Sequence, residues 1–269
     1  MARSFYNLKI ISSGDRIELY HYAGNQEYGF EPRNNSGRKG KGKANNIQNK
    51  KDNLNRARNK IIRYANCNPD LLTFISLTYK ENMRDLKLSK HHLHMLCKSL
   101  QKDYIGFKYL YVLEFQQRGA IHYHMLCNYP ISIKTAKTKE FKPEEQKKLE
   151  REFSEKYWPY GWVDIRSLNQ EGNTNAGLYV SVYLVEDLLK LDLQGSKCYG
   201  HSRNLKKPSE DTVMIEANID SILGDFVKSY ELKYASSYEL RYESNGKSNT
   251  KSVSYFDLYK KNKTDNQGD

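Results

Sequence analysis

Two histidines and one glutamate near the middle of the sequence are spaced as metal ligands would be. They lie in the segment Glu114-Phe-Gln-Gln-Arg-Gly-Ala-Ile-His122-Tyr-His124. Because side chains alternate along a β-strand, His122 and His124 share one face of their strand. In an antiparallel hairpin that turns near Arg118 or Gly119, Glu114 lies across from one of these histidines, with Cβ atoms about 5 Å apart.

Two nitrogens and one carboxylate on one face point to a catalytic divalent cation. Three protein ligands leave positions open for water and phosphate oxygens, as Mg²⁺ or Mn²⁺ requires in catalysis. A structural zinc site would instead be closed by four ligands. The alternative is a pair of hydrogen-bonded histidines on a solvated sheet face.

Hydrophobic patterns predict the elements that position these residues. The run LTFISLTY over Leu72–Tyr79 is rich in β-branched and aromatic residues and predicts a central strand. The candidate ligands lie in a hairpin of strands over Leu110–Gln116 and Ala120–Cys127. Ser89 is expected to cap a helix. We expect further elements as follows: a strand or hairpin within residues 1–30, helices over roughly 46–65, 143–158 and 176–191, a strand over 161–167, and strands over 238–243 and 252–258 joined by a turn at Asn245-Gly246.

Positive charge is concentrated in one segment. The chain has 269 residues and a net charge of +12, and residues 33–63 alone carry +10, from eleven basic residues and one acid. Residues 31–43 predict a mobile basic arm, because they have too little apolar surface to fold alone. Such a block is typical of a surface that binds a polyanion, with a solvated charge run as the alternative. The 22 tyrosines favour nucleic acid, since aromatic rings stack on unpaired bases. The candidate DNA contacts are Lys39, Lys41, Lys43, Arg56, Lys60, Arg63, Arg203, Lys206 and Lys207.

Composition excludes several classes of protein. Hydrophobic residues make up 38% and charged residues 28% of the chain, and no stretch approaches the roughly 20 apolar residues that span a bilayer. The first residues lack the apolar core of a signal peptide, and the four cysteines form no CxxC pair. We therefore expect a cytoplasmic protein with no membrane partner, no disulfide framework and no zinc ribbon.

Three motifs, in order along the chain, resemble those of HUH endonucleases, the rolling-circle replication initiators of plasmids, phages and small DNA viruses. The motifs are FISLTY (Phe74–Tyr79), the hydrophobic-His-x-His segment Ile121–His124, and the tyrosines of Tyr179–Tyr183. More closely, the runs EFQQRGAIHYH, YGWVDI, LYVSVYL and SRNLKKP are similar to a group of bacterial plasmid and phage Rep proteins. This similarity covers residues 45–208.

The resemblance implies an α+β fold with HUH topology. In this fold a central antiparallel sheet holds the Phe74 strand beside the His122 strand, and helices pack over one face. The chain would divide into an N-terminal strand region and basic arm (1–45), an endonuclease domain (46–208), and a small β-rich extension with a disordered tail (209–269). Glu114, His122 and His124 would bind Mg²⁺ or Mn²⁺.

The resemblance also gives Tyr183 the role of nucleophile, while Tyr179 assists or acts in a second cleavage. A tyrosine hydroxyl with its ordinary pKa of about 10 is a poor nucleophile, so attack on a phosphodiester needs a polarised phosphate and in-line geometry. The i, i+4 spacing places the two rings on the same helical face. Core packing is the alternative role for two such tyrosines.

The sequence departs from the usual pattern of these proteins, Tyr-x-x-Lys-Tyr-x-x-Lys. Val182 and Glu186 stand where the two lysines are expected. A lysine beside the scissile phosphate offsets its charge or helps to protonate the leaving oxygen, so its absence predicts an altered rate or metal preference, or a loss of activity. The candidate substitutes are Lys190, Arg203 and Lys206.

The function predicted from the sequence is initiation of rolling-circle replication by a site-specific nickase and ligase that acts on single-stranded origin DNA. Gly37–Ala44 and the Gly-Lys-Ser triplet ending at Ser248 only approximate a Walker A loop, so we expect a host helicase as a partner. One alternative is a relaxase or transposase that uses the same site. Another is a catalytically silent DNA-binding regulator, which the absent lysines favour.

Overall fold

The computed structural model describes residues 5–27, 46–116, 118–136, 141–168, 176–182, 197–244 and 247–261. The chain forms two compact units. One unit combines Met1–Gly42 with Lys207–Asp269, and the other consists of Lys43–Lys206. The candidate metal ligands lie in the second unit, which is described first.

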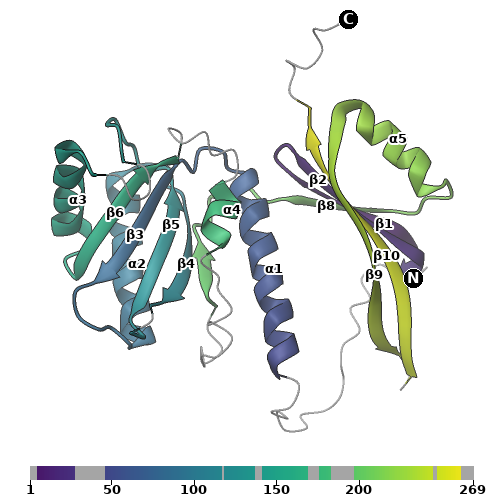
Figure 1. Ribbon diagram of the computed structural model, residues 1–269, viewed down its shortest axis with the longest axis horizontal. Coiled ribbons are helices and arrows are strands. Elements are labelled where there is room, and N and C mark those ends of the chain that lie inside the picture. The colour runs from purple at the N-terminus through teal and green to yellow at the C-terminus, as the bar shows by residue number, and fades with distance from the viewer. Residues whose placement is uncertain are drawn as a thin grey trace, which may run out of the picture. The chain divides into compact units, whose positions relative to one another are not determined.

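The unit Lys43–Lys206 is built on a five-stranded antiparallel sheet in the order β6-β3-β5-β4-β7 (Figure 1). As predicted, β3 lies beside β5, and β4 and β5 form a hairpin, with Gly119 of its turn at φ 78°. The α+β class and the antiparallel sheet are therefore confirmed, whereas HUH topology stays a prediction. The strands are β3 (Thr73–Tyr79), β4 (Tyr109–Phe115), β5 (Ile121–Cys127), β6 (Gly161–Ser167) and β7 (Tyr199–His201).

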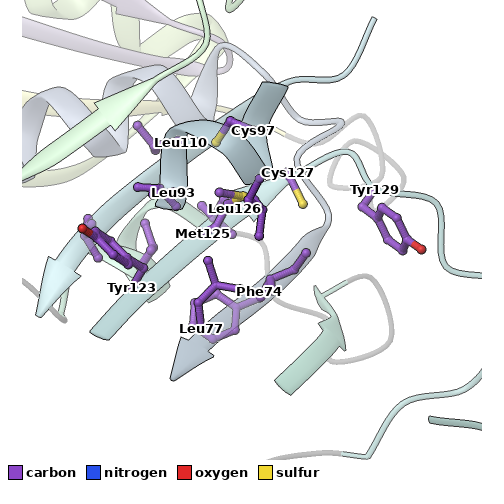
Figure 2. Packing of buried hydrophobic residues seen from close by; sticks show 14 of the residues in the cluster. Phe74, Leu77, Leu93, Cys97, Leu110, Tyr123, Met125, Leu126, Cys127 and Tyr129 are labelled. Carbon is purple, nitrogen blue, oxygen red and sulfur yellow. The ribbon is translucent and has the colours of Figure 1, made fainter. Parts of the chain in front are cut away.

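Helix α2 (Leu86–Asp103) covers one face of this sheet. Its buried Leu93 and Cys97 belong to one apolar cluster with Tyr123 and Met125 of β5 (Figure 2). Spacing of apolar residues at three and four positions along α2 makes this packing possible, because such residues share one side of a helix.

The predicted cap of α2 is wrong by one turn. The helix begins at Leu86, and the Asp85 carboxylate accepts the backbone N–H groups of the first turn, from Lys87 at 2.8 Å and Leu88 at 3.0 Å. Ser89 is instead buried in the first turn, where its Oγ lies 2.6 Å from the hydroxyl of Tyr123. A carboxylate is the better cap, since it also interacts favourably with the positive end of the helix dipole.

Helices α1 (Asn46–Asn66) and α4 (Ala176–Ser181) pack on each other, and their buried residues join the same core. The predicted inward positions Leu54, Ala57, Ile61 and Tyr64 of α1 are all buried. The start of α4 confirms the start of the helix predicted over 176–191, and residues 183–191 of that prediction lie outside the described ranges. None of the helices in the described ranges is long and apolar enough to cross a membrane.

Helix α3 (Glu144–Tyr157) lies along the edge strand β6. The Gln146 side chain donates to the carbonyl of Ile165 at 3.0 Å, and the Glu150 carboxylate accepts the N–H of Ile165, also at 3.0 Å. These bonds satisfy backbone groups on the open edge of β6. Trp158, which follows α3 and is fully buried, donates its indole N–H to the carbonyl of Thr78 at 3.2 Å.

The second unit is another five-stranded antiparallel sheet, in the order β8-β1-β2-β10-β9, with helix α5 against one face (Figure 1). The hairpin expected within residues 1–30 is confirmed as β1 (Phe5–Ser13) and β2 (Arg16–Glu27). The expected C-terminal hairpin is also confirmed, with Ser244 opposite Lys247. The remaining elements are β8 (Ser209–Val213), α5 (Ile219–Ser229), β9 (Tyr230–Ser244) and β10 (Lys247–Lys260).

Helix α5 was not predicted from the sequence. Its Ile219, Ile222, Leu223 and Phe226 recur at helical spacing and pack on the apolar cluster of this sheet. Asn218 caps the helix by accepting the N–H of Asp220 at 3.2 Å. The segment ILGDFV is short and rich in residues that also occur in strands, so periodicity alone does not separate the two structures.

Candidate metal centre

The predicted ligands Glu114, His122 and His124 converge on one face of the β4–β5 hairpin. Glu114 lies directly opposite His122 in the register of the two strands. Glu114 Oε2 is 2.6 Å from His124 Nε2 and 3.5 Å from His122 Nδ1. The parity argument from the sequence is therefore confirmed, because all three side chains point to the same place.

Burial and hydrogen bonding give these groups the protonation states that a metal site needs. Burial raises the pKa of the Glu114 carboxyl, but hydrogen bonds with His122 and His124 outweigh this effect and lower the pKa to about 2. Burial lowers the pKa of His124, whose side chain is only 4% exposed. Near neutral pH the site therefore offers a carboxylate and a neutral imidazole, which are the forms that bind metals.

Two hydroxyl residues of β3 hold the imidazoles from behind. Ser76 Oγ lies 3.1 Å from His124 Nδ1, and Thr78 Oγ1 lies 2.8 Å from His122 Nε2. A proton on each of these nitrogens would leave His124 Nε2 and His122 Nδ1 with lone pairs that face Glu114. Sequence reasoning missed both hydroxyls. The signal was the alternation in FISLTY, which places Phe74, Ser76 and Thr78 on one face.

The three ligand residues fit a divalent cation. Their ligand atoms lie within 4.8 Å of one another, and no other such group occurs among the described residues. Ligands bound at about 2.1 Å around an octahedral ion are about 3 Å apart, so only small side-chain shifts are needed. Such an ion would keep about three positions for other oxygens.

An acidic residue and two cations extend this face onto β6. Asp164 lies across the sheet from Ser76. Its carboxylate bonds to Lys142 Nζ and to Arg166 Nε, each at 2.7 Å. Burial raises the pKa of Asp164, but these hydrogen bonds outweigh it and lower the pKa. The group was also missed, although alternation along WVDIR could have indicated a polar face.

Helix α4 brings Tyr179 close to the metal ligands. The Phe74 ring stacks on His124 at 5.5 Å between centroids, and the edge of Tyr179 meets Phe74 at 4.9 Å. Tyr179 is thus one aromatic ring away from a candidate ligand. Tyr183, the predicted nucleophile, lies outside the described residues.

The positions of the absent lysines are only partly described. The Val182 side chain is 59% exposed, so no apolar packing accounts for the valine at this position. Glu186 and Lys190 lie outside the described residues.

Gly177 is required where α4 meets α1. A Cβ atom at this position would lie 2.7 Å from the Cβ of Ala65 and 2.8 Å from the Cα of Ile62. Any larger residue would push α4, and with it Tyr179, away from α1. This contact was not predictable from the sequence, because it depends on how closely the two helices approach.

The predicted DNA contacts are spread over several segments. Arg56 and Lys60 are exposed on α1, and Arg63 is half-buried. Exposed Lys206 is held at the end of α1, where its N–H donates to Asn68 Oδ1 and its carbonyl accepts from Asn68 Nδ2, both at 2.9 Å. Arg203 and Lys207 are also exposed, and their role in binding DNA stays a prediction. Three predicted contacts, Lys39, Lys41 and Lys43, lie outside the described residues.

Comparison with known proteins connects this site to replication. No curated protein and no solved structure matches the chain. One protein-family model matches, and its range contains the three candidate ligands, Tyr179 and Tyr183. The resemblance noted in the sequence is thereby confirmed: residues 72–188 match the family model of Replication-associated protein ORF2, so this segment is that of a replication-associated protein, consistent with a rolling-circle replication initiator.

Proposed function

We propose that this protein nicks single-stranded origin DNA and later rejoins the strand, as the initiator of rolling-circle replication. The observation that carries the proposal is the convergence of Glu114, His122 and His124 within 4.8 Å, inside the segment matched by a replication-associated family. Two tyrosines of the same segment supply candidate nucleophiles.

Glu114, His122 and His124 would hold Mg²⁺ or Mn²⁺ on the open part of the sheet face. A cation bound there would polarise the scissile phosphate and offset the charge of the transition state. Ser76 and Thr78 would keep the two imidazoles turned toward Glu114. These hydroxyls would thereby fix the geometry of the ligands before DNA binds.

Tyr183 would attack the phosphorus atom. The bond between its oxygen and phosphorus forms while the bond from phosphorus to the 3′ oxygen breaks, and this oxygen takes up a proton. The product is a 5′-phosphotyrosine and a free 3′ hydroxyl. Because a phosphodiester replaces a phosphodiester, a later attack by a 3′ hydroxyl can rejoin the strand without another energy source. Tyr179 would assist or act in the second cleavage.

DNA on this site would need cations to hold its phosphates. Arg56 and Lys60 on α1 are candidates, as are Arg203 and Lys206, which would also compensate for the lysines absent at Val182 and Glu186. The chain has no ATPase motif, so strand separation would depend on a helicase from the host.

The proposal is tested by covalent trapping. Labelled single strands that tile the DNA carrying its gene are incubated with the full chain and Mn²⁺, then denatured and separated on a gel. We expect a labelled protein band that needs the metal and one particular sequence. If DNA is bound tightly but no band forms with any strand or metal, the catalytically silent regulator is the better function.

A relaxase or transposase with the same site would form the same adduct. The strand on which the adduct forms distinguishes these functions. An initiator is expected to cleave at the origin of the replicon that carries its gene.

A further inference from the structure

Trp162 has no structural role that explains its exposure. It lies on β6, and its side chain is 59% exposed. The other tryptophan, Trp158, is fully buried and donates its indole N–H within the core. In the described part of the chain no other ring contacts Trp162. An indole is costly to expose to water, and exposed indoles are enriched where proteins bind other molecules.

The register of the sheet places Trp162 on the same face as the candidate metal ligands. Thr78 lies opposite Trp162 on one side and opposite His122 on the other. Residues that are directly opposite in neighbouring strands point to the same face. Since Thr78 contacts His122 through its side chain, Trp162 also points to the face of the metal centre. Two strand spacings separate the backbones of Trp162 and His122, which is about 10 Å.

Three exposed cations lie around the same end of the sheet. Arg118 donates from Nη2 to the carbonyl of Tyr79, at the end of β3, at 3.2 Å. Arg84 donates to the carbonyl of Arg118 at 2.8 Å, and Lys80 directly follows β3. Within the described residues no carboxylate forms an ion pair with Lys80, Arg84 or Arg118. Their charges are therefore available to phosphate groups.

A depression adjoins the indole. Its volume is about 410 Å³, and its walls include Lys80, Met83, Pro159, Tyr160 and Trp162. Glu81 also lines it and would repel a phosphate placed deep inside, so its apolar walls suit a base better than the backbone of DNA. An aromatic surface with cations beside it is the usual combination in proteins that bind single strands.

We propose that Trp162 stacks on an unpaired base of a single strand, while Lys80, Arg84 and Arg118 contact its phosphates. Stacking beside the metal centre would fix the distance between the bound base and the phosphate to be cleaved. Duplex DNA is a poor ligand here, because the faces of its bases are covered by their neighbours. The inference rests on the proposed function for its substrate, and it assigns the contact that positions that substrate.

The test measures binding without cleavage. The full chain is titrated, in EDTA, with a labelled oligo(dT) of about 20 nucleotides and with an abasic strand of the same length. Trp162→Ala is expected to weaken binding of oligo(dT) about 5- to 150-fold and to leave binding of the abasic strand unchanged. Trp162→Phe keeps a ring and should retain most of the affinity. Met95→Ala, on α2, removes another exposed apolar side chain and serves as the control.

Intrinsic fluorescence gives a second measurement, because the chain has only two tryptophans and Trp158 is buried. Oligo(dT) should quench the emission of the natural chain but not that of Trp162→Phe. Equal affinity of the natural chain and Trp162→Ala for oligo(dT) would overturn the inference. An equal loss for the abasic strand would also overturn it, and so would a lack of any single-strand binding. The proposed function is tested separately, since a chain that passes this test but never forms a covalent adduct contradicts nicking alone.

Discussion

At the scale of single residues, the metal centre was largely predictable. Strand alternation and the length of one turn placed Glu114, His122 and His124 together, because the period of a strand is fixed by its backbone. The residues behind them were not identified. Ser76 and Thr78 lie in a strand that is distant in the sequence, and their contacts depend on the register between β3 and β5. A sequence without an alignment gives no information on that register.

His122→Ala is expected to abolish the metal-dependent adduct with little loss of stability. The His122 side chain is 13% exposed and lies on a polar face, so its removal leaves no large cavity. Circular dichroism and urea unfolding check the fold, and the trapping gel checks the adduct. His124→Ala is the informative contrast, because His124 is more deeply buried and its loss leaves the Ser76 hydroxyl without its partner, at an expected cost of about 1–3 kcal/mol. An undiminished adduct in the double variant would overturn the metal assignment.

Thr78→Val is expected to weaken Mn²⁺ binding about 10- to 100-fold. Valine has nearly the shape of threonine but cannot bond to His122 Nε2, so the imidazole loses the partner that orients it. Electron paramagnetic resonance of free Mn²⁺ gives the affinity directly. The matched control is Thr212→Val, on β8 of the other unit. If both variants bind Mn²⁺ like the natural chain, Thr78 does not position the ligand.

At the scale of elements, local patterns predicted most helices and strands of the chain. The hairpin of β4 and β5, helix α3 and strand β6 have nearly the expected bounds, since each has a strong period and a clear turn or proline at its ends. The errors have local causes. The start of α2 was placed at Ser89 although Asp85 offers a stronger cap, and α5 was missed because its apolar run is short.

Gly177→Ala is expected to destabilise the unit Lys43–Lys206 although alanine favours helices. The gain in helix propensity is about 1 kcal/mol, whereas a Cβ atom 2.8 Å from the Cα of Ile62 meets backbone that cannot easily move. Overpacking of this kind costs about 1–3 kcal/mol, so the clash prevails.

Gly224→Ala in α5 is the control for this substitution. A Cβ atom at Gly224 meets nothing within 4 Å, so the same substitution should stabilise by about 0.5–1 kcal/mol. Urea unfolding followed by circular dichroism measures both variants. A stabilised Gly177→Ala protein would contradict the close packing of α4 on α1.

At the scale of the whole molecule, the two ends of the chain meet in one sheet. β8 pairs with β1, and β10 pairs with β2, across more than half of the sequence. Local periodicity predicted the two hairpins but gives no signal for such distant pairing. The family match covers residues 72–188, all within the other unit. Charge could be located from the sequence, because it needs no knowledge of contacts.

The variant with both Arg56→Gln and Lys60→Gln is expected to bind DNA more weakly and with less dependence on salt. These exposed side chains are one turn apart on α1 and could contact neighbouring phosphates. Each lost contact should reduce the slope of log affinity against log salt by about 0.7–0.9. The control changes Lys98 and Lys102, an exposed pair at the same spacing on α2. An unchanged slope would mean that this side of α1 is an ordinary solvated surface.

The covalent intermediate tests the central claim most directly. The full chain is incubated with the cleaved single strand and Mn²⁺, and the trapped peptide is identified by mass spectrometry. We predict a nucleotide on Tyr183, its loss in Tyr183→Phe, and an adduct that persists in Tyr179→Phe, because phenylalanine keeps the ring and removes only the attacking oxygen. A nucleotide on Tyr179 alone would reverse the two roles. If neither tyrosine is ever modified while DNA is bound tightly, the nicking mechanism is contradicted.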